Sequence, residues 1–327
     1  MRRPSPLMLN LGLAGLVLLL ACLSLTAGRV WVPWNAWVDS SDPRWAIIFD
    51  LRIPRTILGV LVGIALGASG AALQGYTRNP LADAGVLGIS SMAALGGVLS
   101  LYFGLTISSP WLLPAMAIGG AGMGVVLLLM IAGRTSGIVT FVLAGVVLQT
   151  IATAGTALAL NLAPTPWAVL EIVNWLMGAV ADRSVDEVRL AAPFVLAGVA
   201  VLLAVGRGLD ALTLGETGAA SLGIDLSRTR VVIAVGVALA VGASVAVSGV
   251  IGFVGLVVPN LMRPMVGARP GALIIPSALA GAVLILAADI AVRLTPSAAE
   301  VKLAVAMAAI GGPFFLVMLA RLRRRLA

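Results

Sequence analysis

The sequence predicts an all-α, polytopic membrane protein with about ten transmembrane helices, and three observations lead to this fold class. Hydrophobic residues make up 61% of the 327 residues and charged residues only 10%, whereas about 25% of an average soluble domain is charged. The mean hydropathy is +1.12. The apolar residues gather in runs of about 20, the length that a helix needs to cross a hydrocarbon layer about 30 Å thick. Lipid must therefore be the solvent for most of this chain.

Ten apolar runs, separated by short polar connections, are the predicted elements in chain order. We expect transmembrane helices at 7–28, 54–74, 85–104, 111–132, 138–160, 188–206, 229–249, 250–266, 272–291 and 303–320. The first run begins like a signal peptide, but the many spans after it favour an uncleaved helix. The segment 167–180 is amphipathic, so we expect it at the membrane interface. No stretch is long and polar enough for a separate soluble domain, so 1–327 is a single transmembrane domain.

Cationic residues predict the orientation of these spans. Ten spans place both termini on one side of the membrane, and that side receives 13 of the 21 cationic residues. Cytoplasmic loops carry an excess of Lys and Arg, so both termini are predicted to be cytoplasmic. The basic run Arg323–Arg325 near the C-terminus supports this orientation. The net charge of +8 therefore reflects loop anchors, and we expect no nucleic-acid partner.

Small residues form a stripe with a spacing of four in the second predicted helix, at Gly59, Gly63, Gly67, Ala71 and Gly75. Such a stripe lets a second helix approach closely, which indicates a compact bundle. The segments ALGASGAALQG at 65–75 and AVGASVAVSG at 240–249 are similar and lie in spans of opposite direction. This similarity is compatible with an inverted repeat, which is frequent in transporters.

The residues that the chain lacks exclude several classes of function. Histidine is absent and Cys22 is the only cysteine, so the chain offers no His/Cys metal cluster. The single lysine, Lys302, is not part of a Gly-Lys-Ser/Thr phosphate-binding loop, so this chain cannot hydrolyse ATP. A Ser-His-Asp triad is impossible without histidine. We expect neither an enzyme nor a cofactor of this chain's own.

Four charged residues lie at the predicted outer ends of spans, where charge needs an explanation. The spacing of Asp289 and Arg293 predicts an ion pair at the membrane surface. Arg52 and Arg55 flank Pro54, which suits the first turn of a helix. We interpret these two arginines either as interfacial anchors whose side chains reach the headgroups or as a docking patch for an acidic soluble partner.

Four stretches of the chain resemble the type II ABC importer permeases, also called the FecCD type. They are RIPRTILGVLVGIALGASGAALQGYTRNPLADAGVLGISS at 52–91, LGETGAASLGID at 214–225, GVIGFVGLVVPNLMR at 249–263 and IGGPFF at 310–315. They occur in the family's order and cover nearly the whole chain from about residue 50. Two departures are Pro259-Asn260, where the family often has Pro-His, and Glu300–Ala304, which keeps the acid but lacks Pro and Gly. The outer mouth is therefore expected to differ in shape.

The resemblance implies a permease of the bacterial inner membrane that works by alternating access. It implies two permease copies, expected to be a homodimer, around a central pathway, two cytoplasmic ATPase subunits that bind ATP and Mg²⁺, and a periplasmic binding protein. We expect an iron chelate, a ferric siderophore or haem, as cargo, with cobalamin or an oxyanion as alternatives. An ion-coupled secondary transporter is the alternative from another class, although no acid or histidine lies in the middle of a predicted span.

The resemblance also assigns roles to single residues. Within the connection at about 207–228, the residues expected to rest on the ATPases are Leu214, Gly215, Glu216, Ala220, Leu222 and Gly223. The arginines expected to meet acidic residues of the binding protein are Arg52, Arg55 and Arg293. The segment Ser136–Phe141, with Ile138, Val139 and Thr140, matches the cytoplasmic gate. Gln149 and Asn161 are polar candidates for the lining of the pathway.

Overall fold

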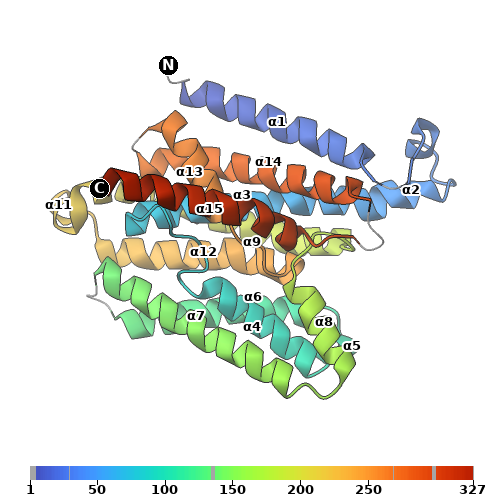
Figure 1. The fold of residues 1–327 in the computed structure, drawn as a ribbon, viewed down its shortest axis with the longest axis horizontal. Helices are drawn as coiled ribbons and strands as arrows, with labels where there is room; N and C mark the ends of the chain where they lie inside the picture. The colour runs from blue at the N-terminus through green and yellow to red at the C-terminus, as the bar shows by residue number, and fades with distance from the viewer. Residues whose placement is uncertain (1–4, 29, 134–136, 268, 297–299, 327) are drawn as a thin grey trace.

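The computed structural model describes residues 5–28, 30–133, 137–267, 269–296 and 300–326, and these residues form a bundle of helices (Figure 1). The elements are α1 (Pro6–Thr26), η1 (Trp34–Trp37), α2 (Arg44–Ala46), η2 (Ile47–Arg52), α3 (Ile53–Thr77), α4 (Ile89–Tyr102), α5 (Leu105–Ser108), α6 (Leu112–Ala132), α7 (Ile138–Asn161), α8 (Pro166–Leu176), α9 (Val185–Ala204), α10 (Gly206–Ala211), η3 (Leu212–Leu214), α11 (Gly215–Ser221), α12 (Leu226–Ser248), α13 (Val254–Val266), α14 (Pro270–Leu294) and α15 (Leu303–Leu326). The all-α fold class is confirmed.

Eight helices of the described chain are long and apolar enough to cross a membrane, and the shorter apolar helices are α4 and α13. Together they match the ten predicted spans. α1 begins and α15 ends at the end of the bundle from which α11 projects, here called the α11 end (Figure 1). This arrangement agrees with an even number of crossings. The cytoplasmic location of that end stays a prediction.

The amphipathic segment predicted at 167–180 forms α8 and the turn after it. α8 packs against α4, with Ile172 and Trp175 buried and Trp167 exposed. Its Thr165 side chain accepts a hydrogen bond from the backbone N–H of Ala168 and so caps the helix. The exposed indole of Trp167 suits an interfacial position.

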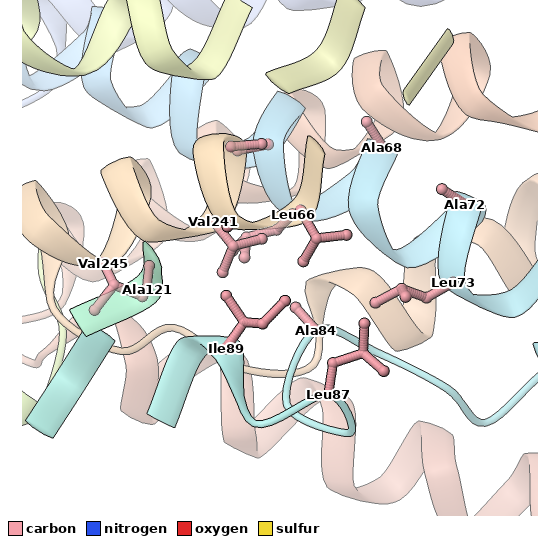
Figure 2. Close-up of a cluster of buried hydrophobic side chains, with 14 of the residues drawn as sticks. Leu66, Ala68, Ala72, Leu73, Ala84, Leu87, Ile89, Ala121, Val241 and Val245 are labelled. Atoms are coloured by element: carbon pink, nitrogen blue, oxygen red, sulfur yellow. The ribbon is translucent and has the colours of Figure 1, made fainter. Parts of the chain in front are cut away.

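α3 is the central helix of one half of the bundle. It packs along α14, and α14 also contacts α1. The helices α13 and α15 complete this half of the bundle. α4, α6 and α7 form the other half, and α12 joins the two because it contacts α3, α4, α6 and α9. Figure 2 shows the core between them, where Leu66 of α3 faces Ile89 of α4 and Val241 of α12, and Leu73 of α3 points toward Leu87 of the connection between α3 and α4.

The small-residue stripe of α3 is the surface on which α14 packs. A Cβ atom added at Gly67 would lie 2.1 Å from the backbone oxygen of Ser277 in α14, and one at Gly63 would lie 2.5 Å from the backbone of Ala282. The two backbones touch there, so only glycine fits, and the interpretation of the stripe as packing is confirmed. The two similar segments at 65–75 and 240–249 lie in α3 and α12, which run in opposite directions (Figure 1). The inverted repeat itself stays a prediction.

Gly67→Ala is expected to lower the free energy of unfolding by about 1–3 kcal/mol, the usual cost of forcing an extra carbon into a packed contact. The matched control is Gly12→Ala in α1, because a Cβ atom at Gly12 meets nothing within 4 Å. Thermal unfolding of the detergent-solubilised protein, followed by size-exclusion chromatography, measures both variants. Equal midpoints for the two variants would contradict a backbone contact between α3 and α14.

Candidate functional site

The segment predicted to rest on the ATPases forms α10, η3 and α11, and α11 projects beyond the other helices (Figure 1). Leu214 and Leu222 are 66% and 63% exposed, and Ala220 and Gly223 are also exposed. Gly215 and Gly223 have φ angles of 90° and 80°, a region that L side chains rarely adopt, so the turns on either side of α11 require glycine. Exposed leucines on either side of such a short helix at a bundle end form a surface suited to a protein partner.

The other side of α11 is turned toward the start of α7. Glu216 is half-buried, and its Oε1 accepts a hydrogen bond of 3.3 Å from the backbone N–H of Ile138. The predicted gate residues are therefore in direct contact with the predicted coupling segment. Ile138 is buried, whereas Val139 and Thr140 are exposed. The first residue of the predicted gate segment, Ser136, lies outside the described residues.

A buried cluster that sequence reasoning missed lies next to this contact. Arg230, near the start of α12, donates through Nε to the Tyr76 hydroxyl at 3.2 Å and through Nη1 to the backbone oxygen of Gly133 at 3.0 Å. Its guanidinium carbon lies 5.7 Å from the centre of the Phe141 ring. The sequence contains a signal for this cluster, because Arg230 falls within the predicted span 229–249. We interpreted this arginine only as a cation of the preceding loop.

α7 has one covered and one uncovered face. The covered face packs on α4 and α6, whereas large apolar side chains such as Leu143 and Ile151 are exposed on the other. The pathway candidates Gln149 and Asn161 lie on the uncovered part, as do Thr150 and Thr153. A glutamine facing hydrocarbon would be costly, so this face is suited to a passage or to a second copy rather than to lipid alone.

The three predicted docking arginines lie close together, but they have partners within the chain. Arg55 donates through Nη2 to Asp289 Oδ1 at 2.7 Å and also pairs with Glu300. The ion pair predicted between Asp289 and Arg293 is confirmed, with Arg293 Nε 2.9 Å from Asp289 Oδ2. Asp289 is 1% exposed and Arg293 is buried, so the pair lies inside the bundle, and its position at the level of the membrane surface stays a prediction. Asp289 is the common partner of two arginines.

Two of these arginines tie α1 to the rest of the bundle. Arg52 donates to the backbone oxygens of Leu25 and Val30 at 2.8 and 2.6 Å, and Arg293 donates to the backbone oxygen of Ser24 at 2.9 Å. Arg52 is buried, so its interpretation as an interfacial anchor is wrong. The docking role stays a prediction. In this conformation the guanidinium groups of Arg52 and Arg293 already donate hydrogen bonds to backbone or carboxylate oxygens of the same chain.

The two sequence departures have clear structural positions. The Asn260 amide donates from Nδ2 to the backbone oxygens of Pro80 and Leu256 at 2.8 and 2.7 Å, which ties α13 to the connection between α3 and α4. Asn260 is therefore a packing residue rather than a titratable one. Glu300 keeps its acid function as a partner of Arg55.

A cavity of about 320 Å³ at the α11 end was also missed by the sequence reasoning. It lies between α3, α13 and the start of α14, next to Thr213, and is lined by Arg78, Arg263 and Arg269. Arg263 donates through Nη2 to Gln74 Oε1 at 2.7 Å. No group of three or more metal-ligating side chains occurs among the described residues.

Comparison with known proteins places this geometry among membrane permeases. The model of the FecCD transport family matches residues 16–321. The vitamin B12 import system permease protein BtuC of Vibrio cholerae is 37% identical, over 94% of this chain and 92% of its own. The Fe(3+) dicitrate transport system permease protein FecD of Escherichia coli is 34% identical, over 96% and 98%. A solved structure of a protein assigned to the metal-chelate type of ABC transporters, in an inward-facing conformation, has a TM-score of 0.85 and 29% identity and covers 97% of this chain and 99% of its own.

Proposed function

This chain belongs to the FecCD transport family and is a permease subunit of an ABC importer rather than an enzyme, and from this premise we propose that it carries an iron chelate, a ferric siderophore or haem, across the bacterial inner membrane. Two copies of the chain would enclose a central pathway. Two ATPase subunits, which bind ATP and Mg²⁺, would sit on α11, and a periplasmic binding protein would deliver the cargo at the opposite end. Both termini would be cytoplasmic.

The uncovered face of α7 is the observation that carries this proposal. It combines exposed apolar side chains with Gln149, Thr150 and Thr153, and no charged residue occurs in α7. The two threonine hydroxyls donate to backbone oxygens one turn earlier in the helix, so they add little polarity. A passage with such a lining would bind a bulky chelate weakly, and weak binding permits release.

Transport would follow from rocking of the helices between two arrangements. ATP binding would draw the ATPases together and displace α11, and the gate residues at the start of α7 would open on one side of the pathway as the opposite side closes. Selection of the cargo would rest mainly with the binding protein. The relatives include importers for vitamin B12 and for Fe(3+) dicitrate, so cobalamin is the second candidate cargo.

Uptake into vesicles tests the proposal. The vesicles hold this chain, its ATPase and its binding protein, with ATP inside or absent, and they are offered labelled ferric siderophore, haem or cobalamin. We expect uptake of an iron chelate only when both ATP and the binding protein are present. Uptake of cobalamin alone would contradict the proposed cargo but support the importer.

An ion-coupled secondary transporter is the second candidate, and buried Asp289 is the observation that bears on it. Ion-coupled transporters use buried acids to hold the coupling ion. Asp289, however, is paired with both Arg55 and Arg293, so its charge is already balanced within the protein. Uptake in the same vesicles that follows an ion gradient and ignores ATP would favour this class instead.

A further inference from the structure

The first turn of α7 is capped by a residue of another helix. The first backbone N–H groups of an α-helix have no partner within the helix, and a side chain at the N-cap position usually accepts from one of them. The N-cap residue of α7 is Gly137, which has no side chain to do so. Glu216 of α11 supplies the acceptor at Ile138 instead. Its negative charge also complements the positive end of the α7 dipole.

The end of α6 is held by α12 in a similar way. Gly133 is the C-cap of α6, and its carbonyl oxygen accepts the hydrogen bond from Arg230. The same guanidinium lies against Phe141 of α7, whose ring also meets the ring of Tyr76 edge-on at 5.6 Å. Phe141 and Arg230 are both buried. One side chain of α12 therefore contacts both α6 and α7.

α11 and α12, which carry these two contacts, form one compact unit. The backbone N–H of Ile224 donates to the backbone oxygen of Ala219 at 3.1 Å, which folds the connection back onto α11. Asp225 caps α12 through a hydrogen bond of 2.9 Å from the backbone N–H of Arg228. A displacement of α11 would thus be shared with the start of α12.

We propose that Glu216 and Arg230 are the positioning residues that transmit movement of α11 to the gate, Glu216 through the first turn of α7 and Arg230 through Gly133 and Phe141. The inference rests on the proposed function, because it names the side chains that would couple the ATPases to the pathway. Leu214 and Leu222, which flank α11, are exposed and accessible to a partner, whereas Glu216 is turned toward α7. The two sides of α11 therefore have separate tasks.

Glu216→Ala in the complete importer tests the proposal, with ATP hydrolysis and cargo uptake measured on the same vesicles. We expect uptake per ATP to fall about fivefold, the population change that loss of one typical capping bond produces. Glu216→Gln keeps an acceptor oxygen and is expected to restore most of the coupling. The control is Glu187→Ala, which removes a glutamate from the capping box of α9 and should leave uptake per ATP unchanged. Arg230→Lys, which loses the forked guanidinium, should resemble Glu216→Ala.

Hydrogen exchange of the same variants supplies a readout that does not depend on transport. Amides of residues 138–141 are expected to exchange faster in Glu216→Ala, while those of residues 185–189 do not change. Unchanged exchange at residues 138–141, or normal uptake per ATP in Glu216→Ala, would overturn the inference. Loss of ATPase binding in Glu216→Ala would also overturn the inference, because Glu216 would then contact the ATPase itself. If the unchanged protein shows no ATP-driven uptake, the proposed function fails instead.

Discussion

Asp289→Ala is expected to lower the free energy of unfolding by about 3–5 kcal/mol, because removing one member of a buried ion pair leaves an uncompensated charge. Here two guanidinium groups, those of Arg55 and Arg293, lose their common carboxylate. Arg293 also holds α1 through Ser24, so the docking of α1 should weaken as well. Thermal unfolding in detergent and protease accessibility of the connection after α1 measure the two effects.

The matched control is Glu300→Ala, which removes the other acidic partner of Arg55. The Glu300 side chain is 38% exposed, so water can replace it as a partner of Arg55. We therefore expect the free energy of unfolding to fall by less than about 1 kcal/mol. An equal fall in the free energy of unfolding for both variants would contradict the role of Asp289 as the common partner of Arg55 and Arg293. The pair of variants also bears on docking. If Glu300→Ala strengthens binding-protein affinity while Asp289→Ala only unfolds the permease, Arg55 is the residue available to a partner.

The double variant Leu214→Asp, Leu222→Asp is expected to weaken ATPase binding by at least about tenfold, since burial of a leucine contributes about 1.5–3 kcal/mol. Both side chains are exposed at the α11 end, and the added carboxylates would need partners in an apolar contact. Titration of the detergent-solubilised permease with the ATPase subunit measures the affinity.

The control for this variant is Ile107→Asp in α5. Ile107 is even more exposed, but its helix α5 lies at the opposite end of the bundle from α11 (Figure 1), so ATPase binding should not change. Unchanged affinity in the double leucine variant would place the ATPase contact elsewhere. The arginine-lined cavity beside Thr213 would then be the next surface to test.

Sequence alone was sufficient for the fold class, the ten spans and the contact surface of α3. Hydropathy is a local property, and a run of about 20 apolar residues crosses a membrane whatever its neighbours are. The stripe from Gly59 to Gly75 is similarly local, because a spacing of four places residues on one face of a helix. The ion pair between Asp289 and Arg293 was predictable for the same reason. The short helix α11 followed from its composition and from the resemblance to a family.

Tertiary structure decided which partners distant residues have. Arg55 and Asp289 are 234 positions apart, Glu216 and Ile138 are 78 apart, and Arg230 and Tyr76 are 154 apart. No local pattern reports such pairs, since they depend on how whole helices pack. For this reason sequence reasoning placed Arg52 and Arg293 on the surface, although the packing of α1, α3 and α14 buries them. The capping of α7 by α11 has the same origin, because a glycine at the start of a helix does not indicate which distant residue will supply the missing acceptor.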